Sequence, residues 1–137
     1  MSEIDRGSSS TQSLPQKTIL VVDDDREILD LVSNYLCSLG YTVLVAKSGP
    51  EAISAVESHF GPIDLLLVDV GMPGMTGIEF VKYFSSRRSD VPVIFMSGFG
   101  ESQELGSLSG AIEFLPKPFS LSELAGKTIR LISATGT

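Results

Sequence analysis

Residues 18–25 read Thr-Ile-Leu-Val-Val-Asp-Asp-Asp, a short apolar run of β-forming residues that ends in three consecutive carboxylates. Similar apolar runs recur along the chain, at Thr42–Ala46, Leu65–Val68, Val91–Met96 and Ala111–Leu115. Because segments of helical length separate these runs, the pattern predicts βαβ units and a parallel sheet with helices on both faces. The first four runs are almost wholly apolar, as in strands buried on both faces, whereas Glu113 interrupts the last run and predicts an edge strand.

Length and charge narrow the class of protein. The 137 residues suit one domain, and a formal net charge of −7 argues against direct binding to nucleic acid, which needs a basic face. Cys37 is the sole cysteine, so the fold does not depend on an internal disulfide. No apolar run approaches the about 18 residues of a membrane span, and no signal peptide is evident, so we expect a cytoplasmic protein without membrane contact. Residues 1–16 are polar and Ser-rich and predict a disordered leader or linker, which leaves residues 17–137 for the domain.

Capping residues mark the predicted helix starts. Three segments match a capping box, in which a hydroxyl and a carboxylate satisfy free backbone N–H groups: Ser48–Glu51, Thr76–Glu79 and Ser120–Glu123. Asp25 is the expected N-cap of the first helix, and Gly40 follows that helix as a stop signal. Residues 101–110 contain two glycines and three serines, which predict a short or irregular fourth helix.

Polar side chains follow four of the predicted strands. They are Asp23, Asp24 and Asp25 after the first strand, Asp69 after the third, Ser97 after the fourth and Lys117 after the fifth. Functional groups gather beyond the carboxyl ends of parallel strands, so we expect these side chains to converge. Clustered carboxylates repel one another unless a cation lies between them, and Mg²⁺ suits oxygen ligands. A carboxylate nucleophile beside Mg²⁺, a hydroxyl and a lysine has the parts needed for phosphoryl transfer.

Four blocks of this sequence resemble the signature segments of the receiver domains of two-component signalling. The blocks are Ile19–Asp24, Leu67–Asp69 with Met72, Pro73 and Gly77, Met96–Gly98, and Lys117–Phe119. They stand in the family's order, and the resemblance covers residues 17 to about 134. It implies the fold of chemotaxis regulators, a flavodoxin-like three-layer sandwich with a five-stranded parallel sheet in the order 2-1-3-4-5 and about five helices.

The resemblance also implies the chemistry of the site. Asp69 matches the phosphoacceptor, which takes a phosphoryl group from a histidine kinase or phosphotransfer protein. Asp24, Asp69 and the backbone carbonyl of Gly71 match the direct ligands of Mg²⁺, which Mn²⁺ can replace, and Asp23 matches a ligand that acts through water. Such a domain is not an enzyme, because it assists only its own phosphorylation and dephosphorylation. We expect a monomer or weak dimer whose output partner the sequence does not identify.

Residues on the last two predicted strands match the family's switch. Lys117 is implied to contact the phosphoryl oxygens, and Pro118 to follow a cis peptide bond. Ser97 is implied to move toward the phosphoryl group, and Phe114 to move inward with it, which switches a protein-interaction surface.

Some positions depart from the family pattern. Gly71 and Phe99 occupy the two positions that flank the phosphoryl group, so we expect them to modulate dephosphorylation. Thr76 stands where many relatives carry an acidic residue, but it is also a good N-cap. The stretch from Ser97 to Lys117 is slightly short for the family, which again predicts a trimmed fourth helix.

Other functions share parts of this pattern. A Mg²⁺-dependent phosphatase or phosphotransferase with an aspartyl nucleophile, resembling the haloacid dehalogenase group, would need a second carboxylate at Gly71. A flavodoxin-like cofactor binder would need a phosphate-binding loop where the chain has three aspartates. A receiver-like interaction module that is not phosphorylated would lack the acceptor or the lysine, and both are present. The sequence leaves open whether the domain is a stand-alone regulator or part of a hybrid kinase.

Overall fold

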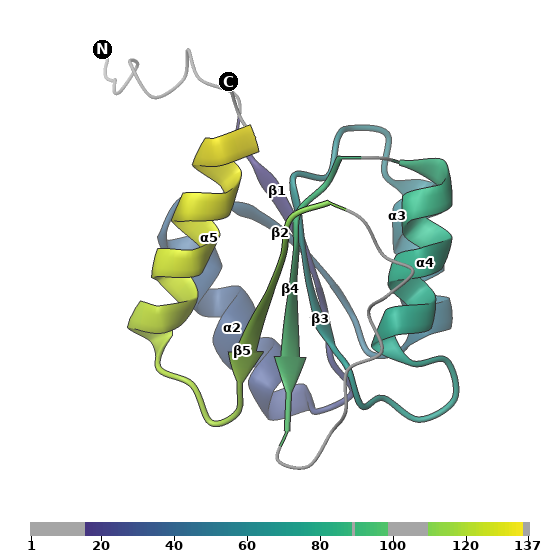
Figure 1. Ribbon diagram of the computed structural model, residues 1–137, viewed down its shortest axis with the longest axis horizontal. Helices are drawn as coiled ribbons and strands as arrows, with labels where there is room; N and C mark the ends of the chain where they lie inside the picture. The colour runs from purple at the N-terminus through teal and green to yellow at the C-terminus, as the bar shows by residue number, and fades with distance from the viewer. Residues whose placement is uncertain (1–15, 89, 99–109, 136–137) are drawn as a thin grey trace, which may run out of the picture.

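The computed structural model describes residues 16–88, 90–98 and 110–135, and it has three layers, with a central sheet between two pairs of helices (Figure 1). The strands are β1 (Thr18–Val22), β2 (Thr42–Ala46), β3 (Leu65–Asp69), β4 (Val93–Ser97) and β5 (Ile112–Pro116). The helices are α2 (Arg26–Ser38), α3 (Gly49–Ser58), α4 (Gly77–Arg87) and α5 (Leu121–Thr135). Helices α2 and α5 cover one face of the sheet, and α3 and α4 cover the other.

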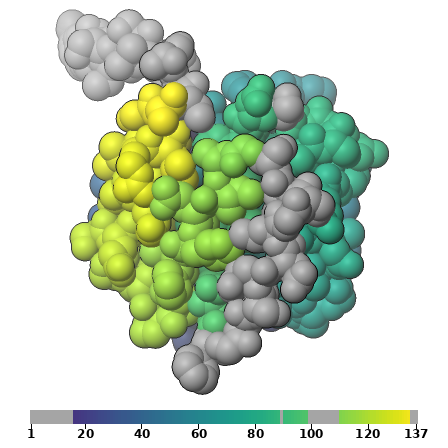
Figure 2. All heavy atoms as spheres, viewed as in Figure 1, coloured from purple at the N-terminus to yellow at the C-terminus, as the bar shows by residue number. Residues whose placement is uncertain are grey.

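All neighbouring strands are parallel, and their order is β2-β1-β3-β4-β5, which confirms the predicted flavodoxin-like sheet. The predicted edge position of the last strand is also confirmed, and Figure 2 shows residues of β5 at the surface beside α5. Full burial was predicted for the first four strands and is correct for β1, β3 and β4. It is wrong for β2, which lies at the opposite edge and leaves Val45 49% exposed.

The described residues contain four helices. The irregular helix predicted for residues 101–110 lies, except for Gly110, outside the described part of the chain, as do residues 1–15 of the predicted leader. Strand β4 begins at Val93, two residues later than predicted, because Pro92 has no N–H to donate to the sheet. Across the described ranges no helix is long and apolar enough to cross a bilayer, and the cytoplasmic location stays a prediction.

Alternation along the strands divides the core into two clusters, because successive side chains point to opposite faces. Leu20 and Val22 pack with the buried side of α3 and α4, whereas Ile19 and Val21 pack with α2 and α5. All four of these side chains are completely buried. Burying such a side chain contributes about 1.5–3 kcal/mol, so β1 and β3 form a rigid support for the residues at their carboxyl ends.

The predicted caps are present, with one difference. Asp25 accepts hydrogen bonds from the N–H groups of Glu27 and Ile28, which confirms it as the N-cap of α2. Two complete capping boxes start α4 and α5, formed by Thr76 with Glu79 and by Ser120 with Glu123. The box predicted at Ser48 is only half formed, because the Glu51 carboxylate accepts from the N–H of Lys47 rather than from that of Ser48.

Candidate functional site

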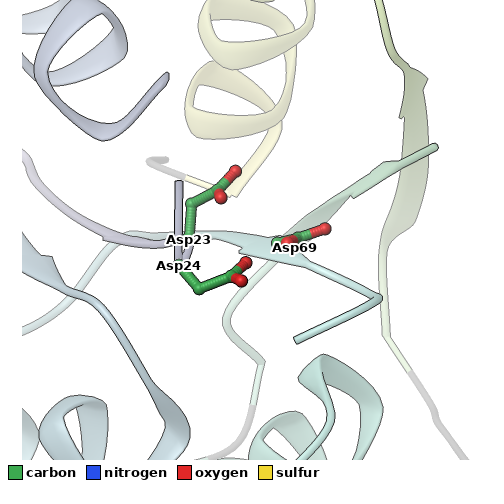
Figure 3. Close-up of side chains that lie close together, drawn as sticks. All are labelled: Asp23, Asp24 and Asp69. Atoms are coloured by element: carbon green, nitrogen blue, oxygen red, sulfur yellow. The ribbon is translucent and has the colours of Figure 1, made fainter. Parts of the chain in front are cut away.

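Three aspartates meet at the carboxyl ends of the two central strands. Asp23 and Asp24 follow the last residue of β1, and Asp69 is the last residue of β3, the next strand in the sheet. Each offers a carboxylate oxygen, and these three atoms lie within 4.8 Å of one another. Figure 3 shows the three carboxylates on the same side of the strand ends. Asp23 and Asp69 are buried, whereas Asp24 is exposed, so solvent reaches the cluster from one side.

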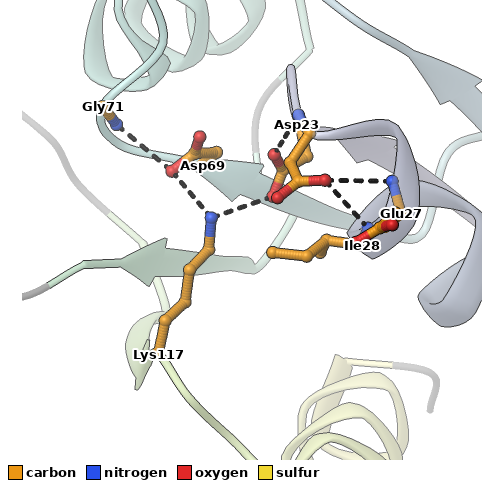
Figure 4. A network of polar contacts seen from close by, with 7 residues as sticks. Asp23, Glu27, Ile28, Asp69, Gly71 and Lys117 are labelled. Atoms are coloured by element: carbon orange, nitrogen blue, oxygen red, sulfur yellow. Dashed lines mark hydrogen bonds and ion pairs between the residues drawn. The ribbon is translucent and has the colours of Figure 1, made fainter.

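Lys117 brings a positive charge to this cluster from the far edge of the sheet. Its Nζ lies 3.1 Å from Asp23 Oδ2 and 3.5 Å from Asp69 Oδ1 (Figure 4). The residue directly follows β5, and its backbone N–H donates to the carbonyl of Ser97 at 2.7 Å. The Lys117–Pro118 peptide bond is cis, which agrees with the expectation for Pro118.

Backbone N–H groups hold the two buried carboxylates in place. The N–H of Asp25 donates to Asp23 Oδ1 at 2.8 Å, and the N–H of Gly71 donates to Asp69 Oδ1 at 3.3 Å. The carboxylate of Asp25 is itself engaged as the N-cap of α2. Its role is therefore structural, as the sequence indicated.

Burial and neighbouring charges shift the pKa values of the groups in the site in opposite directions. Burial, followed by the charge of Asp23, raises the pKa of Asp69 from 3.8 to about 6, although Lys117 and the Gly71 N–H act in the other direction. Burial also raises the pKa of Asp23, against the lowering effects of the Asp25 N–H and of Lys117. The two carboxylates in turn raise the pKa of Lys117, which outweighs the effect of its partial burial. The cluster thus sets three carboxyl groups against one ammonium.

A divalent cation fits this arrangement. The donor atoms are carboxylate oxygens, which are the ligands of Mg²⁺ and Mn²⁺, and the exposed side leaves room for the waters that Mg²⁺ retains. A cation between the carboxylates would offset their repulsion and lower the raised pKa of Asp69. Asp24, Asp69 and Asp23 are the side chains that could hold it, and Gly71 lies beside them in the loop after β3.

The other residues predicted for the site are Ser97, Phe114 and Phe99. Ser97 is buried at the end of β4, one residue beyond Met96, which pairs with Asp69 across the sheet. Phe114 is half-buried in β5, and its ring stacks on that of Phe95 with centroids 5.9 Å apart. Phe99 lies outside the described residues. The described contacts therefore bring together the side chains of Asp23, Asp24, Asp69 and Lys117. Ser97 is joined to Lys117 through its backbone carbonyl, and no described contact joins the Phe114 ring to the cluster.

The sequence did not predict the cavity of about 400 Å³ beside Lys117. Its lining consists of Ile28, Leu31, Gly98, Lys117, Pro118 and Phe119. The sequence did contain a sign of this cavity, because Leu31 is an apolar residue that lies off the apolar stripe of α2. In the structure its side chain is 53% exposed. The cavity and the acidic cluster thus share one residue, Lys117.

Known proteins resemble this chain in sequence and in fold. The model of the response regulator receiver domain family matches residues 19–128. The transcriptional regulatory protein CpxR of Klebsiella pneumoniae is 39% identical over 111 residues, which are 80% of this chain and 46% of CpxR. The uncharacterized transcriptional regulatory protein YrkP of Bacillus subtilis is 37% identical over 113 residues, which are 81% of this chain and 47% of YrkP.

The chain thus spans about half the length of the curated relatives it matches. Among solved structures, the chemotaxis protein CheY4 of Vibrio cholerae has a TM-score of 0.74 and 33% sequence identity. The match covers 85% of this chain and 99% of CheY4. The family model spans most of the described residues. This chain therefore belongs to the family of response regulator receiver domains.

Proposed function

We propose that Asp69 accepts a phosphoryl group from a phosphohistidine of a histidine kinase or phosphotransfer protein, in a reaction that depends on Mg²⁺. The observation that carries this proposal is the position of the Asp69 carboxylate. It lies 3.5 Å from the Lys117 ammonium and within 4.8 Å of a carboxylate oxygen of the exposed Asp24. A nucleophile in this setting has an ammonium nearby and neighbouring carboxylates that could hold a metal ion.

The transfer step needs an ionised Asp69. With a pKa of about 6, most of this carboxylate is ionised at pH 7 even before a cation lowers the pKa further. One oxygen of Asp69 attacks the phosphorus atom, and a P–O bond forms as the P–N bond to the donor histidine breaks. The electron pair of that bond leaves with the imidazole nitrogen. Lys117 then stabilises the charge on the phosphoryl oxygens, and a Mg²⁺ ion held by Asp23, Asp24 and Asp69 would supply further neutralisation of that charge.

The response to phosphorylation is proposed to pass through β4 and β5. Ser97 lies at the end of β4, where its hydroxyl would turn toward the phosphoryl group. Phe114 on β5 would move with it, out of its present stacking on Phe95. Such a paired movement would change the surface beside β5, at which we place the unidentified output partner. Gly71 and Phe99 are proposed to influence how long the phosphoryl group persists.

The experiment compares the wild-type chain with Asp69→Asn and Asp25→Asn. Each protein is incubated with acetyl phosphate and Mg²⁺, and its intact mass is measured before and after treatment with hydroxylamine, which cleaves acyl phosphates. Asp25→Asn is the matched control, because it removes a neighbouring carboxylate and Asn is also a good N-cap. We expect one added phosphoryl group on the wild type and on Asp25→Asn, and none on Asp69→Asn.

A phosphohistidine donor tests the partner class separately. Incubation with a phosphorylated histidine phosphotransfer protein should transfer label to the wild type and not to Asp69→Asn. If the wild type gains no phosphoryl group from either donor and binds no Mg²⁺ in titration calorimetry, the proposed function is wrong.

A further inference from the structure

Helix α4 starts in direct contact with the backbone of the proposed phosphoacceptor. A Cβ atom added to Gly77, the first residue of α4, would lie 2.2 Å from the carbonyl oxygen of Asp69 and 3.0 Å from its carbonyl carbon. It would also lie 2.9 Å from Cγ1 of Val68. The conflict is with backbone, which cannot rotate away as the end of a side chain can. Glycine is therefore needed here for the close approach of two backbone segments.

Both sides of this contact are held firmly. Helix α4 buries Phe80, Val81 and Phe84 in the core, each no more than 1% exposed. Strand β3 is buried along its whole length. Neither element can retreat without opening the core, so a side chain at Gly77 would displace the peptide that joins Asp69 to Val70.

The same contact closes the loop that surrounds the acceptor. The N–H of Gly77 donates to the carbonyl of Val70 at 3.3 Å, and the N–H of Val70 donates to the carbonyl of Met96 at 2.9 Å. Within this loop the N–H of Gly71 donates to the Asp69 carboxylate. A shift at Gly77 is therefore transmitted to the Asp69 side chain and to the Gly71 carbonyl.

We infer that Gly77 is a positioning residue for phosphoryl transfer, which places the Asp69 carboxylate and the Gly71 carbonyl by allowing α4 to lie against the Asp69 peptide. This inference rests on the proposed function of Asp69. Lengthening the 2.2 Å contact to the 3.0 Å that real Cβ atoms keep requires a movement of about 0.8 Å. A displacement of about 1 Å in a reacting group lowers rates by about a hundredfold.

Two other glycines provide matched controls. Gly49 is the first residue of α3, as Gly77 is of α4, but the nearest atoms to a Cβ there belong to the side chain of Met75, from 2.5 Å at its sulfur to 2.8 Å at its own Cβ, and not to the backbone of the phosphoacceptor. A Cβ at Gly126, in α5, would meet nothing within 4 Å. Gly49→Ala tests alanine at a helix start, and Gly126→Ala tests alanine in open space, where it also favours the helix.

The experiment measures the rate of phosphorylation by acetyl phosphate and the affinity for Mg²⁺ and beryllofluoride. Gly77→Ala is made in the wild type and in the Gly126→Ala background, whose more stable α5 helps the variant to fold. Circular dichroism verifies that each protein is folded. We expect Gly77→Ala to lower the rate and the beryllofluoride affinity by about ten- to a hundredfold, and Gly49→Ala and Gly126→Ala to change them less than twofold.

If Gly77 had a purely structural role, Gly77→Ala would lower the stability of the protein but leave the Mg²⁺ and beryllofluoride affinities of the folded protein unchanged. That result would overturn the inference. Failure to fold in both backgrounds would overturn it too, because Gly77 would then serve folding rather than positioning. If adding Val68→Ala to the Gly77→Ala variant restored the rate, the contact with the Val68 side chain would be the cause of the loss and not the contact with the Asp69 carbonyl. That result would also overturn the inference. A wild type that is not phosphorylated would instead refute the proposed function itself.

Discussion

Replacing Asp69 with Asn is predicted to stabilise the folded protein at neutral pH, although it removes the proposed phosphoacceptor. Burial, followed by the charge of Asp23, raises the pKa of Asp69 from 3.8 to about 6, so the folded protein binds this proton more tightly than the unfolded chain does. Such a difference corresponds to about 3 kcal/mol, at about 1.4 kcal/mol for each pKa unit. Ionisation of Asp69 therefore costs the folded state about 3 kcal/mol above pH 6. The cost is absent below about pH 3.8 and grows as the pH rises between these two values.

Urea unfolding followed by circular dichroism measures this difference, since the chain has no tryptophan for fluorescence. In EDTA at about pH 7.5, we expect the free energy of unfolding of Asp69→Asn to exceed that of the wild type by about 3 kcal/mol, and at about pH 5 by roughly half as much. Saturating Mg²⁺ should reduce this difference in the free energy of unfolding, because Mg²⁺ favours the ionised carboxylate of the wild type. Asp25→Asn removes a carboxylate at an exposed helix cap, and its free energy of unfolding should lie within about 0.5 kcal/mol of that of the wild type. Equal stability of Asp69→Asn and the wild type at about pH 7.5 would refute the reasoning.

Three further predictions, two of them with control variants, concern the site and the start of α4. Lys117→Met leaves a buried carboxylate 3.1 Å away without its ammonium partner, so we expect a loss of about 1–3 kcal/mol in urea unfolding and no phosphorylation. As a control, Lys127→Met breaks the more exposed ion pair with Glu113 and should cost at most about 1 kcal/mol. An equal loss of stability in the two variants would contradict the argument that burial of its partner makes Lys117 the more important lysine. Asp24→Asn, at an exposed residue, should weaken Mg²⁺ binding at least about tenfold in calorimetry and change stability by less than about 0.5 kcal/mol. Thr76→Ala removes the N-cap of α4 and should cost about 1 kcal/mol, whereas Thr76→Ser should keep most of the stability; a Ser variant as unstable as Ala would argue against the cap.

The sheet was largely predictable because it depends on a simple periodic signal. Apolar runs of strand length, separated by helical segments, identified all five strands to within two residues at each end. The burial of β2 was not predictable from its composition, because an edge strand can be as apolar as a central one. Its exposure depends on which strands lie beside it, which is a property of the whole sheet. The half-formed capping box at Ser48 likewise depends on a local choice, since the Glu51 carboxylate reaches either of two adjacent N–H groups.

The site was predictable in outline for a similar reason. Parallel strands end at one edge of the sheet, so carboxylates and a lysine after β1, β3 and β5 had to lie near one another. The sequence could not show that Lys117 lies closer to Asp23 than to Asp69, because that depends on side-chain positions. Nor could it show why Gly77 stands at the start of α4. A close approach of two backbone segments leaves no trace in the residue pattern except the glycine itself.

The position of Lys117 between two carboxylates links the chemistry of the site to the rest of the sheet. In the unphosphorylated protein its ammonium lies closer to Asp23 than to Asp69. A phosphoryl group on Asp69 would add negative charge on that side, so the ammonium would be drawn away from Asp23 and toward the acceptor. Lys117 directly follows β5, and its N–H is bonded to the carbonyl of Ser97, so a movement of this residue acts on the ends of both β4 and β5. If Asp69 is phosphorylated as proposed, competition between Asp23 and the phosphoryl group for one ammonium would act on β5, the strand that carries Phe114.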